Sequence, residues 1–394
     1  MRLAPVHSWA MTAAALLLVE ARPLAAGDPI FDQSRLHETR IVMDPADWRS
    51  LRENYLTNQY YAADLTIDGE TIQQAGIRSR GAGSRSGDKP GLKVDFNKYV
   101  KSQEFHGYKT LVLDNLFQDP SYLRERLAYL VFEAMGIASP QNAHTRLYVN
   151  GEYWGLYALI ESISKPFLKA RIGEESGNLF DYEFVGPYHF EYKGDDPAQY
   201  VPLPFDPETN EDHLDPSGLI AFVRTANQAP DESFIDEISA FIDVRQFLAY
   251  LAVENALAEK DGLLGDEGMN NLYLYQYGGQ NRFVFIPWDK DTALSDTLWP
   301  VLRNVGENVL ARRLLERPGE RQTYLDRIKE AVDNFVNPGW LGPRLEEAYD
   351  QVRHAALQDD KKPFTDEDFE IAIHGLEEVI EARRPDVYSQ LGLR

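Results

Sequence analysis

Alternating apolar and polar positions dominate the first part of the chain and predict β-strands. Residues 61–81 alternate on either side of Asp68-Gly69, a pair typical of a tight turn between two antiparallel strands. A second hairpin is predicted over residues 145–161, where Asn150-Gly151 stands at the turn. Single strands are predicted at residues 40–44, 91–96 and 110–116.

Two helices interrupt these strands. Pro45 opens the first, over residues 45–54, since proline is well tolerated at the first helical position. The second covers residues 120–136; it starts at Pro120-Ser121 and is stopped by Gly136. The first part of the chain is therefore predicted to be rich in β-structure.

The pattern changes after about residue 162. Apolar residues recur at helical spacing over residues 216–228 and 243–262. A third hairpin is predicted over residues 270–289, with its turn at Gly278-Gly279. Beyond Asp291 the pattern predicts helices only.

These elements predict an α+β fold. A β-rich part covers about residues 37–162, and a mainly helical part with one embedded hairpin covers about residues 163–394. No Gly-, Ser- or Pro-rich linker separates the parts, so we predict that residues 27–394 form one folded unit.

The N-terminus resembles an export signal. Arg2 precedes an apolar run at residues 9–19, and small residues follow it up to Ala26. We predict a signal peptide over residues 1–26, with a retained anchor as the alternative. Cleavage would leave a secreted, periplasmic or cell-surface protein with no stable membrane span.

Charge and cysteine content exclude several classes of function. The formal net charge is −23, which argues against nucleic-acid binding and against docking on anionic lipid, because both need a basic face. The sequence contains no cysteine, so disulfides, thiolate catalysis and zinc–thiolate sites are excluded. A polyanionic ligand would need a local basic cluster or metal ions.

Such a basic cluster lies between two predicted strands, in residues 77–96. Glycines let backbone N–H groups approach a phosphate, and basic side chains supply charge. The Walker A pattern is absent. The alternative is an exposed hairpin loop. The candidate anion-binding residues are Arg80, Gly81, Gly83, Ser84, Arg85, Lys89 and Lys93.

A second candidate region is the polar loop at residues 260–271. Asp266 and Asn271 have the D-x-x-x-x-N spacing of the protein-kinase catalytic loop. There the aspartate receives a hydroxyl proton and the asparagine holds a metal ion. Asp261 is a second candidate for the base, and Asn270 also lies in the loop. The alternative is an ordinary loop of turn and capping residues.

The third candidate region follows the apolar run at residues 283–286. Asp289 and Asp291 stand just past this predicted strand and would lie on one side if the strand continued. Hard oxygen ligands without nearby cysteine or histidine suit Mg²⁺ or Mn²⁺. The alternative for Asp291 is a cap on a following helix.

The three regions occur in the order found in kinases: phosphate loop, base with asparagine, and metal carboxylate. A lysine–glutamate pair would complete the set. The lysine candidates are Lys89 and Lys93, and the glutamate candidate is Glu161 at the end of a predicted strand. A surface ion pair is the alternative for these residues.

The chain resembles the CotH kinase family over roughly residues 40–384. The motifs are RSRGAGSRSGDKPGLKVDF, LYVNGEYWGLYALIE, DEGMNNLYLY and FIPWDKD. The resemblance implies an atypical, secretory-type protein kinase fold that uses ATP with Mg²⁺ or Mn²⁺. It also implies transfer of the γ-phosphate to Ser or Thr of exported proteins.

Within this resemblance, Asp266 matches the catalytic aspartate of a D-x-x-x-N-N pattern that ends in Asn270 and Asn271. Asp289 and Asp291 match the metal ligands of W-D-x-D. The asparagine expected after Arg-Gly is Ala82 here. A catalytically inactive structural or surface-binding protein is the main alternative function, because a fold does not guarantee activity. A metal-dependent hydrolase is the second alternative.

Overall fold

The computed structural model describes residues 28–393, so the predicted signal peptide lies outside the described residues. The fold is α+β, as predicted, and its buried apolar side chains form two clusters. The smaller cluster fills a β-barrel, and the larger lies among the helices and a second sheet. None of the helices in residues 28–393 is long and apolar enough to cross a membrane.

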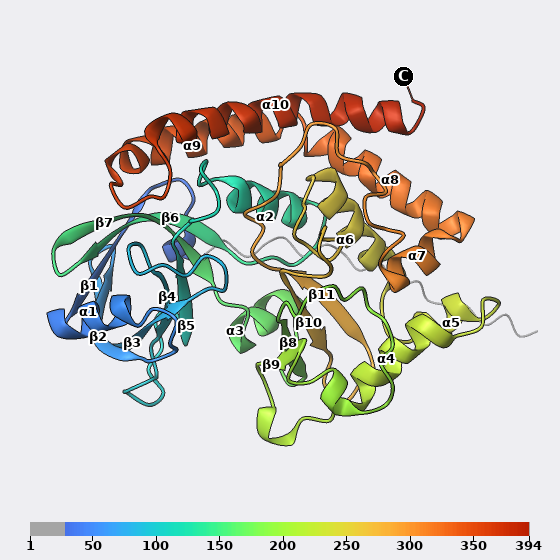
Figure 1. Ribbon diagram of the computed structural model, residues 1–394, viewed down its shortest axis with the longest axis horizontal. Helices are drawn as coiled ribbons and strands as arrows, with labels where there is room; N and C mark the ends of the chain where they lie inside the picture. Colours follow the sequence, from blue (N-terminus) through green and yellow to red (C-terminus); the bar gives the residue numbers. More distant parts are fainter. Residues whose placement is uncertain (1–27, 394) are drawn as a thin grey trace, which may run out of the picture.

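The β-rich part closes into a seven-stranded barrel (Figure 1), which the sequence pattern did not predict. The order is β1-β2-β3-β4-β5-β7-β6, and the parallel pairing of β1 with β6 completes the ring. Two predicted hairpins, β2–β3 and β6–β7, are confirmed. The strands are β1 (His37–Met43), β2 (Tyr61–Ile67), β3 (Glu70–Arg80), β4 (Gly91–Asp95), β5 (Thr110–Asp114), β6 (Asn142–Val149) and β7 (Glu152–Glu161).

Two helices interrupt the barrel strands along the sequence. Helix α1 (Pro45–Glu53) begins at Pro45, as predicted, and Asp44 accepts a hydrogen bond from the N–H of Ala46 at its N-terminus. Helix α2 (Arg124–Ala134) begins three residues after Ser121, because Asp119 and Ser121 form the turn that precedes it. Gly136, in the left-handed region, follows its end. A 3₁₀ turn, η1 (Pro29–Phe31), precedes β1.

A four-stranded sheet forms the base of the larger cluster. The predicted hairpin of β10 (Leu272–Gln276) and β11 (Phe283–Pro287) is confirmed, but it is extended by two strands that were not predicted, in the order β11-β10-β8-β9. The first is β8 (Asn178–Tyr182) and the second is the short β9 (Phe205–Pro207). Around it lie α3 (Lys165–Phe167), the π-helix η2 (Leu168–Ile172), η3 (Pro197–Gln199), η4 (Glu211–His213), α4 (Ser217–Gln228), α5 (Phe234–Ile238) and α6 (Val244–Ala256).

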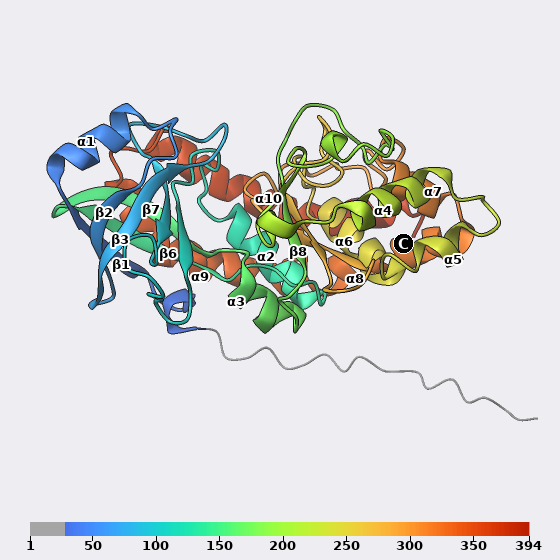
Figure 2. The ribbon, with the colours of Figure 1, turned by 90° about the horizontal axis from the view of Figure 1, so that it is seen from below.

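The segment after Asp291 is not wholly helical, so that prediction was wrong. Residues 292–308 form turns, and Asn308 rather than Asp291 caps the next helix. The C-terminal helices are α7 (Val309–Leu315), α8 (Pro318–Asn334), α9 (Leu341–Gln358) and α10 (Asp366–Gln390). Helix α9 contacts β7 and α10 contacts α8, so this helix pair lies along both parts of the molecule (Figures 1 and 2).

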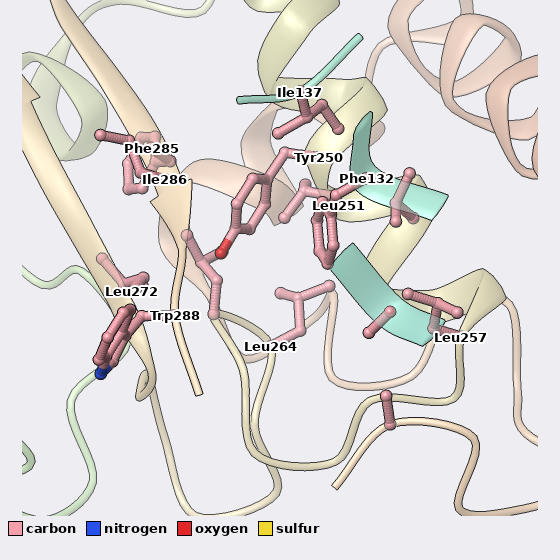
Figure 3. Close-up of a cluster of buried hydrophobic side chains, with 14 of the residues drawn as sticks. Phe132, Ile137, Tyr250, Leu251, Leu257, Leu264, Leu272, Phe285, Ile286 and Trp288 are labelled. Atoms are coloured by element: carbon pink, nitrogen blue, oxygen red, sulfur yellow. The ribbon is translucent and has the colours of Figure 1, made fainter. Parts of the chain in front are cut away.

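The larger core supports the strand end that carries Asp289. In Figure 3, Tyr250 of α6 lies between Phe285 of β11 and Phe132 of α2, and the ring centroids of Phe132 and Tyr250 are 5.5 Å apart. Leu264 of the preceding loop packs in the same cluster. Apolar packing therefore fixes the end of β11 and the loop before β10 against one another.

Candidate active site

Two loops meet where β10 begins and β11 ends. Asp261 accepts a hydrogen bond from the side-chain amide of Asn270 to one carboxylate oxygen and from that of Asn271 to the other, each at 3.0 Å. Asn271 adopts a left-handed φ of +52°, which asparagine tolerates better than most residues. All three residues are partly exposed.

The backbone of Asn271 joins this loop to the segment that carries Asp289. Its carbonyl oxygen accepts from the N–H of Trp288 at 3.2 Å and from Lys290 Nζ at 3.0 Å. Lys290 is also paired with Glu254 of α6 at 2.9 Å, and both side chains are fully buried. Burial alone would lower the pKa of Lys290, but Glu254 and Glu259 raise it, so the lysine stays charged.

Asp289 and Asp291 lie near one another in a crowd of carboxylates. Burial and the charge of Asp114 raise the pKa of Asp289 to about 7. Burial and the charge of Asp289 raise the pKa of Asp291 well above its ordinary range. Strand β11 ends at Pro287 and Asp289 has a φ of +49°, so the expected strand continuation was wrong. The two carboxylates meet through a turn.

Helix α2 supports Asp289. The N–H of Asp289 donates to the hydroxyl of Tyr129 at 3.0 Å, and that hydroxyl donates to Glu125 at 2.7 Å. Glu125 and Tyr129 are one helical turn apart and share a face. Burial, with the charges of Asp289 and Asp114, raises the pKa of Glu125. The backbone of Asp289 is thus anchored to a helix from the β-rich part of the chain.

Helix α2 also holds the segment after Asp291. Arg124 donates to the carbonyl oxygens of Ala293 and Leu294, each at 2.6 Å. Buried Asp119 accepts from the N–H of Arg124 and pairs with its guanidinium at 3.3 Å. This clamp fixes the turn on which Asp291 lies.

Arg80 brings the basic loop to the carboxylates. It pairs with Asp114 at 2.5 Å, and its guanidinium lies 5.7 Å from the ring centre of Trp288. Burial lowers the pKa of Arg80, but the charges of Asp114 and Asp289 raise it by more, so the net change in its pKa is upward. Lys93 lies opposite Arg78 on the neighbouring strand β4 and is partly exposed. These cations lie on the outer face of the barrel.

The other predicted loop residues are used differently. The guanidinium of Arg85 donates to the carbonyl oxygens of Gly81 and Tyr55 and to the side chain of Asn58, so it holds the loop itself. The backbone carbonyl oxygen of Ser84 accepts a hydrogen bond from the side-chain amide of Asn115. Gly81 needs glycine at φ +108°, whereas Gly83 is open to solvent.

The prediction that Lys89 pairs with Glu161 was wrong. Lys89 is fully buried and pairs with Asp359, which follows α9, at 2.6 Å. Glu161 instead accepts from the N–H of Gln141 at 3.0 Å and lies 3.9 Å from Arg171. The alternative of a surface ion pair is also wrong for Lys89, because both its side chain and that of Asp359 are 0% exposed. The partner is 270 residues away in the sequence, so spacing gave no signal for it.

Asp266 lies apart from the asparagines. Its side chain is 37% exposed and accepts from Arg303 at 2.9 Å and from Asn304 at 2.8 Å. Of the two aspartates predicted as candidates for the base, the structure therefore places Asp261, and not Asp266, against Asn270 and Asn271.

The carboxylates of Asp289 and Asp291 suit a hard divalent cation whose remaining coordination positions are filled by a bound ligand. Within residues 28–393 no group of three or more His, Cys, Asp or Glu side chains is arranged to hold a metal ion by itself. Mg²⁺ is often bound by one or two carboxylates together with substrate phosphates. Asp289 and Asp291 supply such a pair, and a cation would relieve the repulsion that raises their pKa values.

Comparison with known proteins identifies the family of the chain. The sequence profile described as CotH kinase protein matches residues 77–386, more than half of the chain. The chain belongs to this family. The inner spore coat protein H of Bacillus subtilis is 23% identical over 340 residues, which cover 84% of this chain and 91% of that protein.

Other similar proteins are more distant in length or structure. Spore coat protein homolog 1 of Rhizopus delemar is 24% identical over 358 residues, covering 84% of this chain but 56% of that protein. A solved structure of the Helicobacter pylori proinflammatory kinase CtkA has a TM-score of 0.33 and 11% identity, and the match covers 77% of this chain and 95% of that one. That structural similarity is too slight to assign the fold.

Several residues that build the site were not predicted from the sequence. Asp114 is the last residue of β5, but the predicted strand ran on to residue 116, so the sequence did not mark Asp114 as a strand end. Glu125 and Tyr129 have helical i,i+4 spacing on a predicted helix, a signal that was available. Glu254 and Lys290 gave no signal, because only packing brings α6 against the segment after β11.

Proposed function

We propose that this protein is an exported, metal-dependent protein kinase that transfers the γ-phosphate of ATP to Ser or Thr of secreted or surface proteins. The observation that carries the proposal is the contact of Asp261 with both Asn270 and Asn271, beside Asp289. A base next to an asparagine and a metal-binding aspartate is the arrangement that phosphoryl transfer requires. Membership of the CotH kinase protein family supports it.

Asp261 is the candidate general base. The acceptor hydroxyl would donate a hydrogen bond to its carboxylate and pass its proton there as its oxygen forms a bond to the γ-phosphorus. The bond from that phosphorus to the β–γ bridging oxygen breaks, and ADP leaves with the electron pair. Asn270 and Asn271 orient the carboxylate by donating one hydrogen bond to each of its oxygens. Asp266 is the alternative candidate for the base.

Asp289 and Asp291, with Asn271, are the residues that would hold Mg²⁺ or Mn²⁺. When bound, the cation supplies charge neutralisation for the nucleotide phosphates. Arg80 would add positive charge near the nucleotide phosphates, because it lies close enough to Asp289 to interact electrostatically with it. Lys93 on β4 and Arg78 on β3 lie on the same outer face of the barrel as Arg80, and these residues form the basic face of the barrel. Buried Lys89 and carbonyl-bound Arg85 support the loop instead.

The location and substrate class rest on the relatives. Similar proteins named as spore coat proteins, together with the predicted signal peptide, support a coat, surface or secreted location. A kinase at such a location would act on exported proteins.

The test uses purified protein with labelled ATP, Mn²⁺ or Mg²⁺, and a Ser/Thr-containing protein acceptor such as casein. We expect metal-dependent incorporation of label and its loss in D289N. A matched control is D296N, which changes a nearby exposed aspartate outside the cluster. Binding of Mn²⁺–ATP without any transfer would instead favour the inactive, kinase-like binding protein. Release of free phosphate without acceptor labelling would favour a hydrolase.

A further inference from the structure

Glu259 occupies a buried position between the two loops of the candidate site. Its side chain is 2% exposed, and it follows α6 by three residues. One carboxylate oxygen, Oε1, accepts from the N–H of Asp261 at 2.8 Å and also from the hydroxyl of Thr292. A single oxygen atom therefore contacts both the base loop and the segment that begins at Asp289.

The two carboxylate oxygens of Glu259 have different surroundings. Its other oxygen, Oε2, is buried and has no hydrogen-bond partner within the described residues. Burial raises the pKa of Glu259, and the charge of Lys290 opposes that rise. A buried carboxylate with one unpartnered oxygen costs stability, so the contribution of Glu259 lies in the two contacts of its Oε1 atom.

We propose that Glu259 is a positioning residue that sets the Asp261 carboxylate relative to Asp291 through Thr292. This inference rests on the proposed function. Glu259 touches neither substrate nor nucleotide in this scheme; it acts through the backbone of Asp261 and the residue next to Asp291. Outer residues that orient catalytic and metal-binding groups typically change metal affinity or activity by about 10–100-fold when they are replaced.

The hydroxyl of Thr292 offers the cleaner variants, since Thr292 is partly exposed and its replacement should not prevent folding. T292V keeps the shape and removes the donor, whereas T292S keeps the donor. We expect T292V to lower kcat and weaken Mn²⁺ binding, each by about 10–100-fold. T292S should restore both, and the thermal midpoint should change little in either variant. Mn²⁺ binding is measured by electron paramagnetic resonance of the free ion, without ATP.

A double-mutant cycle with E259Q tests whether both residues act through one contact. We expect E259Q/T292V to be no worse than the more severe single variant. The control is E267Q, an exposed glutamate on the same loop, which should match wild type. The proposal is overturned if T292V matches wild type, if T292S loses as much as T292V, or if the two changes are additive. A wild-type protein without phosphoryl transfer would contradict the proposed function and this role with it.

Discussion

Lys89 and Asp359 form an ion pair of 2.6 Å in which neither side chain is exposed to solvent. The same Asp359 oxygen also accepts from the hydroxyl of Tyr122 and from the N–H of Leu156. Gly155 has a φ of +116°, and a Cβ there would lie 2.4 Å from the Asp359 carboxylate, so glycine makes the approach possible. The C-terminal helices are thereby joined to the basic loop of the barrel.

We expect K89M to destabilise the protein by about 3–5 kcal/mol, because it leaves the Asp359 charge buried without its partner. K93A should change the free energy of unfolding much less, since Lys93 is partly exposed. Urea unfolding of both variants makes the comparison. An unchanged midpoint for K89M would show that the buried pair does not form.

The KM for ATP should depend on Lys93 rather than on Lys89, the reverse of the expected effect on stability. K93A and R80A should raise it, because both residues lie on the basic face that we assign to the phosphates. R312A, which changes an exposed arginine on α7, is the control. If neither K93A nor R80A changes the KM, the nucleotide binds elsewhere.

Asp261 and Asp266 can be distinguished by asparagine variants, which keep the side-chain shape. General-base contributions are typically about 10²–10⁴-fold, so we expect D261N to lose phosphoryl transfer by that factor while still binding Mn²⁺–ATP. D266N should have a small effect, because its surface ion pair with Arg303 is about 40% exposed on each side. Initial rates of acceptor labelling provide the measurement. Inactive D266N beside active D261N would reverse the assignment.

The contribution of Asp289 to the stability of the metal-free protein should fall as the pH rises from about 4 to 7. The pKa of Asp289 is about 7 against an ordinary value of 3.8, so in this window the folded state binds more protons than the unfolded state. The Asp289 contribution therefore decreases with rising pH until the carboxyl is ionised, whereas buried His144, with a pKa lowered to about 3, contributes in the opposite direction. Asp181, with a pKa also raised to about 7 by burial, contributes in the same direction as Asp289.

D289N should make this pH dependence shallower. Mn²⁺ should stabilise the wild type more at pH 8 than at pH 6, because the carboxylate of Asp289 is ionised at pH 8 and can bind the metal ion. Thermal midpoints across this range, with and without Mn²⁺, test both statements. D289N should also abolish Mn²⁺–ATP binding. A variant with the pH dependence and the metal stabilisation of the wild type would exclude Asp289 as the ligand.

The export signal gives an independent prediction. Protein recovered from outside the cytoplasm should begin near Gly27, because we predict a cleaved signal peptide over residues 1–26. N-terminal sequencing tests this. An intact Met1 on the exported protein would favour the retained anchor.

The sequence by itself determined the local elements. Turn pairs such as Asp68-Gly69 and Gly278-Gly279 specify their hairpins through backbone conformations that neighbouring residues largely decide. Pro45 likewise fixed the start of α1. The positions of Asp289 and Asp291 past a strand end were also readable, because a strand that stops at a proline has a local cause.

Only the tertiary structure decided which charged groups meet. Closure of the barrel depends on the pairing of β1 with β6, and strands β8 and β9 gain their place from a sheet formed later in the chain. Lys89 met Asp359 rather than Glu161, and Asp261 rather than Asp266 met the asparagines, because packing and not spacing sets these distances. A buried charge must be paired, but its partner is set by the tertiary packing and cannot be predicted from the spacing of charged residues in the sequence.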